Sequence, residues 1–243
     1  MAGHYDDPTY DYQFYWQGRE YEHQSEVLAI KKLLQNKYFK NQADIGGGFG
    51  RLYPTFVAFS KKVTLLEPSK KLRDLAKKSY PDLIVRHATS DKIPFRKNTF
   101  DFISMIRVSH HLPNLAKTFS EIHRVLKPDG YYLLEVANSA NFKTRLLHLF
   151  TPLPKVPIEK RSPANIRRQT IAFVNHHPDT VLSLLEKPGF IVEQILSVSN
   201  FRSPFLKSII PLKVLLFLES AFCHLLSGIY YGPSLFILTR KIN

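Results

Sequence analysis

The chain has 243 residues, of which 44 % are hydrophobic and 22 % charged, and its formal net charge is +14 at pH 7. These values are typical of one globular domain with a sizeable core. The single cysteine, Cys223, excludes an internal disulfide and a cysteine-rich metal site and agrees with a reducing compartment. The first residues include Asp6 and Asp7 and lack the basic start and apolar run of a signal peptide. We therefore expect a cytoplasmic protein without a metal site.

In chain order, residues 1–18 are aromatic and polar, and residues 20–35 predict an amphipathic helix. Strands are predicted near residues 42–45, 63–67, 83–86, 100–105 and 131–137. Helices are predicted at about 50–58, 69–78, 115–126 and 179–187. The pair Asp129-Gly130 is predicted to end the third of these helices. Alternating strands and helices predict a doubly wound, Rossmann-like, mostly parallel sheet with helices on both faces.

The most informative run is residues 43–50, Ala-Asp-Ile-Gly-Gly-Gly-Phe-Gly, with the spacing D-x-G-x-G-x-G. Clustered glycines indicate a backbone that turns sharply while a ligand approaches it closely. We predict a strand ending near Ile45, a glycine turn, and a helix from about Phe49. Such a unit places the ligand at the N-terminus of the helix, where free N–H groups gather.

The spacing also indicates which ligand to expect. The dinucleotide fingerprint G-x-G-x-x-G fails because Arg51 stands at its third glycine, and the phosphate-loop motif is absent. The apolar run 63–67 ends in Glu67. In a βαβ unit this carboxylate lies beside the glycine loop and can accept hydrogen bonds from both hydroxyls of a ribose. The pattern therefore predicts a nucleoside without a pyrophosphate.

Three further segments make the chain resemble the class I S-adenosylmethionine-dependent methyltransferases. Residues 91–101 match the family's L-P-F-x-x-x-x-F-D segment, and residues 108–113 match its L-H-H-L-P turn. Residues 121–135 match E-x-x-R-V-L-K-P-G-G and the next strand, so that the resemblance covers about 40–138. It implies a seven-stranded sheet and S-adenosyl-L-methionine as cofactor. The nearest pattern is the small-molecule group that includes quinone-biosynthesis enzymes.

The resemblance also implies site residues. The implied cofactor-binding residues are Asp44, Gly46, Gly47, Gly48, Gly50, Glu67, Pro68, Thr89, Ser90, Ile106 and Arg19. Thr89 departs from the acid that the family usually has, and Asp91 could replace it. A sulfonium methyl is already activated, so a base is needed only when the acceptor loses a proton during attack. No catalytic residue is assigned; His111, for which a packing role is the rival interpretation, and Arg107 are the candidates.

Three regions flank the predicted cofactor core, which covers 36–138. Residues 1–35 could form a lid in which Tyr15 or Tyr21 closes on the cofactor, or they could merely pack on the sheet. Residues 139–178 form a basic insertion or substrate cap. Its basic residues are Lys143, Arg145, Lys155, Lys160, Arg161, Arg167 and Arg168, against the single acid Glu159 between 143 and 168. This charge favours an anionic partner, whether a phosphorylated small molecule, a lipid surface or nucleic acid, with a plain solvated face as the alternative.

The last region, 179–243, completes the sheet and contains an apolar helical insert. Between Val214 and Leu238 the only formally charged residue is Glu219. This stretch predicts an apolar cap over a hydrophobic substrate site, an oligomer interface or a contact with a membrane surface. A spanning segment is disfavoured because Glu219 would cost about 2.5–3.5 kcal/mol near the bilayer centre.

The favoured function is methyl transfer to a small acceptor that could be apolar or lipid-linked. The alternatives are a cofactor-binding protein without turnover and an RNA methyltransferase. The chain lacks the tetrad [DN]-P-P-[YF], which disfavours methylation of an exocyclic base nitrogen, and no DNA partner is expected. No nucleic-acid-binding module is recognisable, which disfavours RNA.

Overall fold

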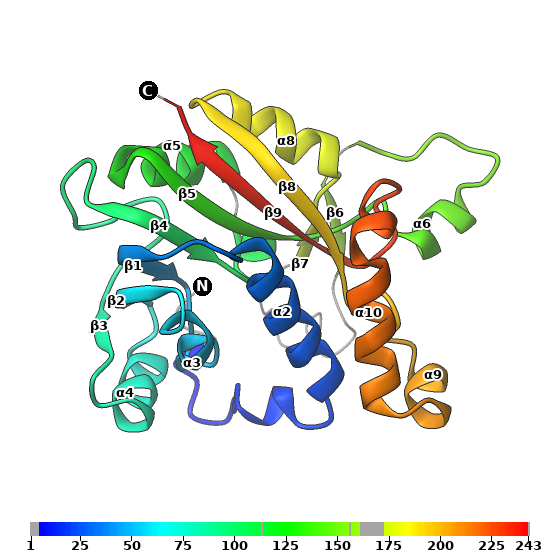
Figure 1. Ribbon diagram of the computed structural model, residues 1–243, viewed down its shortest axis with the longest axis horizontal. Helices are drawn as coiled ribbons and strands as arrows, with labels where there is room; N and C mark the ends of the chain where they lie inside the picture. Colours follow the sequence, from blue (N-terminus) through cyan, green and yellow to red (C-terminus); the bar gives the residue numbers. More distant parts are fainter. Residues whose placement is uncertain (1–4, 113, 156, 161–172, 243) are drawn as a thin grey trace.

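The computed structural model describes residues 5–112, 114–155, 157–160 and 173–242. In this part of the chain the main sheet has seven strands in the order β3-β2-β1-β4-β5-β9-β8 (Figure 1). The strands are β1 (Phe39–Ile45), β2 (Ser60–Leu66), β3 (Ile84–Arg86), β4 (Phe100–Met105), β5 (Leu126–Ala137), β8 (Phe190–Val198) and β9 (Ser234–Lys241). The first five are parallel, and β9 runs antiparallel to both of its neighbours. The predicted Rossmann-like, mostly parallel seven-stranded sheet is therefore confirmed.

Helices cover both faces of this sheet. The longer helices are α2 (Glu20–Leu33), α4 (Lys70–Ser79), α5 (Leu115–Val125), α8 (Pro178–Glu186) and α10 (Leu212–Ser227). Shorter ones are η1 (Phe14–Trp16), α3 (Tyr53–Phe56), η2 (Ser109–His111), α6 (Phe142–Leu147) and α9 (Pro204–Ile209). Phe119 of α5 and Val181 of α8 belong to the core on one face. Ile30 of α2, Phe56 of α3 and Cys223 of α10 belong to the core on the other.

Two local predictions are corrected. The helix expected at 50–58 is the short α3, which begins only at Tyr53, because turns closed by hydrogen bonds from Gly50 to Gly47 and from Tyr53 to Gly50 follow the glycines. The pair Asp129-Gly130 does not end a helix. α5 ends at Val125, and the pair lies inside β5, where the pairing with β4 shifts register and Asp129 adopts a φ of 60°.

Helix α10 packs on α2 and β8. Glu219, buried in this contact, accepts a hydrogen bond of 2.6 Å from the Tyr21 hydroxyl. The same carboxylate accepts hydrogen bonds from the backbone N–H groups of Ser199 and Asn200 and from the Asn200 side chain. The Glu219 carboxylate thus links α10 to α2 and to the loop after β8. The Tyr21 hydroxyl is occupied by this contact.

The basic insertion is described only in part. It contains α6 and a small two-stranded sheet of β6 (Ile158–Lys160) and β7 (Phe173–Asn175). Arg161, Arg167 and Arg168 lie outside the described residues. The helix predicted at about 179–187 is α8, and the side chain of His177 caps its start by accepting a hydrogen bond from the N–H of Asp179. The predicted boundaries at 138 and 178 stay a prediction.

Candidate active site

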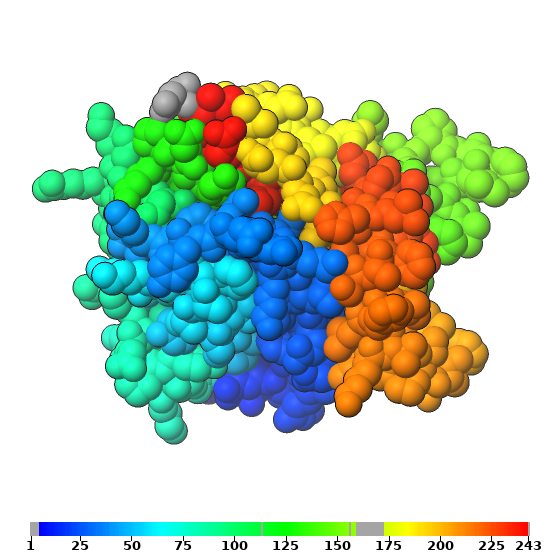
Figure 2. All heavy atoms as spheres, in the orientation of Figure 1, coloured from blue at the N-terminus to red at the C-terminus, as the bar shows by residue number. Residues whose placement is uncertain are grey.

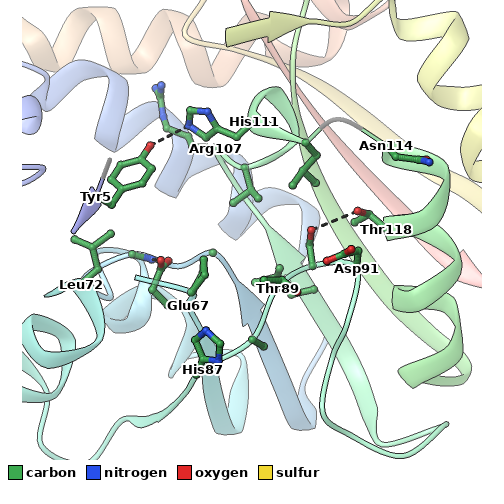
Figure 3. Close-up of a pocket in the computed structure, with 18 of the residues that line it drawn as sticks. Tyr5, Glu67, Leu72, His87, Thr89, Asp91, Arg107, His111, Asn114 and Thr118 are labelled. Atoms are coloured by element: carbon green, nitrogen blue, oxygen red, sulfur yellow. Dashed lines mark hydrogen bonds between the residues drawn. The ribbon is translucent and has the colours of Figure 1, made fainter. Parts of the chain in front are cut away.

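A pocket of about 450 Å³ lies at the carboxyl ends of the parallel strands (Figure 3). Ile45 and Gly46 line it at the end of β1, Glu67 follows β2, and Arg107 follows β4. Here the strand order reverses between β1 and β4, which is the usual position for a ligand in an open α/β sheet. Its volume falls within the range of about 300–1,000 Å³ for small-molecule sites.

The glycine loop forms the floor of the pocket. Gly48 has a φ of +61°, and a Cβ atom built there would lie 3.3 Å from the ring of Tyr12. A Cβ atom on Gly47 would collide with the Asp44 carboxylate and with Leu65. Any side chain at these two positions would therefore push the loop into its neighbours or into the pocket.

Two buried carboxylates support this loop. Glu67 accepts hydrogen bonds from the N–H groups of Gly48 and Ser69, at 3.0 and 2.9 Å, and also lines the pocket. Asp44 lies beneath the loop and accepts a hydrogen bond of 2.7 Å from the Ser104 hydroxyl. Burial raises the pKa of each carboxyl group to about 7, although these hydrogen bonds act in the opposite direction. Each oxygen of Glu67 keeps a lone pair that can accept a further hydrogen bond.

One wall comes from residues 87–91 after β3 and from the start of α5. The hydroxyls of Ser90 and Thr118 lie 3.3 Å apart. Asp91 forms an ion pair of 2.9 Å with Lys117, and both side chains are largely exposed. This ion pair holds the rim of the pocket, because its two members come from the 87–91 loop and from α5.

Aromatic and basic groups form the opposite wall. The Tyr5 hydroxyl lies 2.9 Å from His111 Nε2, and both residues line the pocket (Figure 3). Phe173 of β7 contacts the rings of His110 and His111. His110 is buried, which lowers the pKa of its imidazole well below the usual value, so it stays neutral and serves packing.

Arg107 joins this wall to a buried cluster behind it. Its Nε donates to Glu26 at 2.6 Å, and its backbone N–H donates to Glu135 at 3.0 Å. Glu26 also pairs with Arg51, whose guanidinium lies 3.6 Å from the Trp16 ring centre. The two cations lower the pKa of Glu26 despite the opposing effect of its burial. Arg107 is thus held in a fixed direction at the pocket wall.

The N-terminal segment lies over the pocket and is tied to α4. Asp6 accepts hydrogen bonds from the Ser69 hydroxyl and the Lys71 N–H, at 2.7 and 3.0 Å. The Lys71 ammonium donates to the carbonyl of Tyr10 at 2.7 Å. Tyr5 and Tyr12, which flank these ties, contact each other edge to face. Tyr5 and Tyr12 of this segment line the pocket, whereas Tyr15 and Tyr21 do not, and the predicted lid stays a prediction.

Comparisons with known proteins agree with this geometry. Residues 43–134 match the family described as "Methyltransferase domain". The chain is similar to a demethylmenaquinone methyltransferase of Chlorobaculum tepidum, with 28 % identity over 157 residues, 61 % of this chain and 65 % of the relative. It is also similar to a ubiquinone/menaquinone biosynthesis C-methyltransferase of Blochmanniella pennsylvanica, with 32 % identity over 127 residues, 50 % of this chain and 49 % of that one. The chain thus spans about half to two thirds of the length of these relatives.

A solved structure extends the likeness to the whole fold. It is an S-adenosylmethionine-dependent methyltransferase from Thermotoga maritima, described as a possible histamine N-methyltransferase, with a TM-score of 0.66 at 18 % identity. The match covers 99 % of this chain and 100 % of that one. Residues 43–134 of this chain therefore match a methyltransferase domain, and the fold is that of S-adenosylmethionine-dependent methyltransferases. S-adenosylmethionine is the cofactor named in the description of that solved structure.

The pocket of this methyltransferase domain fits that cofactor. The backbone at Gly48 borders space that a side chain would fill, and the buried Glu67 carboxylate keeps acceptor capacity beside it. The predicted residues that line the pocket are Gly46, Gly48, Glu67, Pro68, Thr89, Ser90, Arg107 and His111.

The other predicted residues lie elsewhere in the methyltransferase domain. Asp44 lies behind the glycine loop, and the Cα of Gly47, within the loop, faces Asp44 rather than the pocket. Ile106 is buried, and Gly50 faces Tyr80. The Arg19 guanidinium stacks on Tyr15, 4.2 Å from its ring centre. Cofactor contacts for these five positions stay predictions.

The lining residues that sequence reasoning missed are Tyr5, Tyr12, Ile45, Leu72, His87, Ala88, Val108, Leu112, Asn114, Lys117 and Thr118. For His87 and Ala88 a signal existed, because they directly follow the third predicted strand, whose carboxyl end borders the site. Tyr5 and Tyr12 come from a segment whose path is set by contacts with Ser69 and Lys71, far along the chain.

Proposed function

We propose that this protein transfers a methyl group from S-adenosylmethionine to a ring carbon of a small, apolar quinol or phenol. The observation that carries the proposal is Glu67, a buried carboxylate beside a side-chain-free loop, in one pocket with the Tyr5–His111 pair. The names of the two curated relatives support the acceptor class. The proposal places the protein in the cytoplasm. It also includes contact with a membrane surface, because so apolar an acceptor partitions into lipid.

Within this proposal, Glu67 accepts hydrogen bonds from the two ribose hydroxyls. Each such charge-assisted bond contributes about 1.5–3 kcal/mol. The wall from His87 to Ser90 receives the adenine, and the Gly46–Gly48 backbone runs beside the methionine part. When bound, the cofactor would supply an electrophilic methyl group, and the electron pair of the broken carbon–sulfur bond would stay on sulfur as a neutral thioether. The chain's own task is to hold the acceptor in line and to exclude water.

The proposed role of His111 follows from proton balance. When a carbon–methyl bond replaces a ring carbon–hydrogen bond, one proton must leave the acceptor, and it passes to a base and then to solvent. The Tyr5 hydroxyl and His111 Nε2 lie 2.9 Å apart at the pocket wall, and in this proposal the pair takes up the proton, which makes the imidazole an imidazolium before the proton passes to solvent. Arg107 beside His111 stabilises the phenolate oxygen that makes the ring carbon nucleophilic. Val108 and Leu112 supply the apolar wall for the ring.

The first experiment is calorimetric titration with S-adenosylmethionine, S-adenosylhomocysteine and NAD. We expect both sulfur ligands to bind and NAD not to bind. Radiolabelled methyl transfer is then measured to a naphthoquinol, a simple phenol and RNA. Label in the quinol or phenol supports the proposal. Binding without transfer to any acceptor, or transfer to RNA alone, would contradict it.

His111→Asn separates chemistry from binding. We expect the turnover rate to fall by about 10²–10⁴-fold, the range for loss of a general base, with unchanged affinity for S-adenosylhomocysteine. The matched control is His224→Asn, which removes an exposed imidazole on α10. Equal turnover of the two variants would assign His111 to packing.

A further inference from the structure

Helix α10 is apolar on the face that points away from the protein. Leu215, Glu219 and Cys223 form its buried face. On the opposite side Phe217 and Leu225 are 70 % and 72 % exposed. A surface helix of a water-soluble domain normally carries polar and charged residues on that side. Packing within the described part of the chain therefore does not account for these side chains.

The apolar face continues beyond α10. Figure 2 shows α9 and α10 next to each other at one side of the molecule. The docking surface, as we define it, consists of Phe205, Ile209, Val214, Phe217, Leu225 and Ile229, all exposed. Contiguous apolar area of this kind on a surface marks an interaction site.

A second exposed apolar segment begins at α6, beside the end of this surface. The ring of Phe142 stacks on Tyr231 with 4.9 Å between centres, and its N–H donates to the Tyr231 carbonyl at 2.9 Å. After this anchor, Leu147 and Phe150 are 84 % and 94 % exposed. Phe150 is thus almost wholly in water, in the segment that follows the Phe142 anchor.

The charges within both segments have one sign, and the neighbouring carboxylate of Asp179 is paired with Lys155. Residues 139–155 contain no acid, and residues 203–231 contain only Glu219, which is buried and hydrogen-bonded. Lys143 and Lys213 are exposed in the same two segments. Apolar side chains together with lysines, and without an exposed carboxylate, are complementary to anionic lipid headgroups above an acyl layer. A second copy would bring like charges together, and nucleic acid would leave the apolar side chains in water.

This side of the molecule adjoins the edge of the sheet where the pocket lies. Ala137 at the end of β5 pairs with Ser234 at the start of β9. α6 follows the first of these strands and α10 precedes the second, so both meet the sheet at the carboxyl ends of its parallel strands. No helix in the described ranges is both long and apolar enough to cross a bilayer.

We propose that the docking surface and the α6 segment bind the surface of an anionic membrane, with Phe217, Leu225 and Phe150 inserted among the lipids. Membrane docking would bring the protein to an apolar acceptor dissolved in lipid. In this respect alone the proposal rests on the proposed function. Lipid binding itself requires no turnover, so the two can fail separately.

The test is vesicle flotation of the full chain. Phosphatidylcholine vesicles containing phosphatidylglycerol are compared with pure phosphatidylcholine, at low and high salt. We expect flotation with the anionic vesicles and weakening at high salt, since surface attraction is screened. The double variant Phe217→Glu/Leu225→Glu should reduce the bound fraction by about tenfold or more, because two apolar anchors are lost. Lys213→Glu should reduce it less.

Matched controls place the same changes elsewhere. Val57→Glu alters an exposed apolar residue beside α3, and Lys61→Glu reverses an exposed lysine on β2. Both should float like the unmodified protein, and all variants should bind S-adenosylhomocysteine equally in calorimetry. Absence of flotation, or equal flotation of the double variant and Val57→Glu, overturns the proposal. A dimer in light scattering that Phe217→Glu dissociates would also overturn it, by assigning the surface to a second copy.

Discussion

One buried glutamate, Glu67, supports the glycine loop and another, Glu219, lies in helix α10, and the two carboxylates have different roles. Glu67 accepts backbone hydrogen bonds and still faces a pocket. Glu219 accepts two hydrogen bonds on each oxygen, from Tyr21, Ser199 and Asn200, and lies outside the pocket described above. The difference teaches that a buried charge identifies a binding site only when part of its acceptor capacity points into open space. The side of α10 that faces solvent is instead apolar.

The largest expected effect is that of Gly48→Val. A positive φ costs a residue with a side chain about 1–2 kcal/mol, and the new methyl groups would occupy the pocket beside Tyr12. We expect affinity for S-adenosylhomocysteine to fall by more than about 100-fold, or about 2.7 kcal/mol, in calorimetry. The comparison variant Gly228→Val, at the end of α10 with ordinary φ, should bind normally. Normal affinity of Gly48→Val would remove the loop from the cofactor site.

Replacing Glu67 with alanine should cost at least about 1.5 kcal/mol of binding free energy, the lower bound for one of its two charge-assisted ribose hydrogen bonds. Glu67→Gln should lose less, because its amide oxygen can still accept. The matched control is Glu193→Gln, a partly exposed carboxylate paired with Arg240 on the outer strands. A dissociation constant that is the same for all three variants would move the ribose contact away from Glu67.

Glu219→Gln should have the opposite pattern, with lower stability of the fold and unchanged affinity for the ligand. The new amide group would face backbone N–H donors of Ser199 and Asn200, so we expect a loss of about 1–3 kcal/mol in the free energy of unfolding. Denaturant titration measures this loss, with Ser227→Ala on the exposed end of α10 as control. Binding of S-adenosylhomocysteine should be unchanged. If affinity falls together with stability, the two regions are coupled and the contrast drawn above fails.

The smallest effect is the pH dependence of binding. Burial raises the pKa of Glu67 to about 7, and the ribose hydroxyls prefer the ionised carboxylate. Affinity should therefore be constant above pH 7 and fall by up to about tenfold per pH unit below it. Glu67→Gln should flatten this slope, and any remaining slope should disappear on adding Asp44→Asn, whose carboxyl group also has a raised pKa. A slope that persists in the double variant would come from another group.

Much of the sheet could be predicted because its strands are continuous apolar runs buried on both faces. Val63 to Leu66 illustrates this, since every residue in that run is buried. Helix starts were harder to predict. Phe49 follows the glycines as a first helical residue could, but turns around Gly50 delay α3 to Tyr53. Asp129-Gly130 has the composition of a turn, but it falls at the register shift inside β5, between the β4-paired residues Leu126 and Tyr131.

The candidate site was predictable where it follows the strand ends and not where it depends on distant contacts. Glu67 directly follows β2, so position in the chain was sufficient. Tyr5 reaches the pocket because Asp6 binds Ser69 and Lys71, a contact that no local pattern reveals. Tyr21 was a reasonable lid candidate by composition, but its hydroxyl bonds to Glu219, 198 positions later.

The bond between Tyr21 and Glu219 has a consequence for the order in which the protein can fold during its synthesis. Helix α2 leaves the ribosome long before its partners β8 and α10, which come later in the chain. Until they emerge, the apolar side of α2 and the unpaired edge of β5 remain exposed, because β9 also comes late. Contacts so distant in sequence close slowly. The nascent chain is therefore expected to need protection from aggregation until its final residues are made.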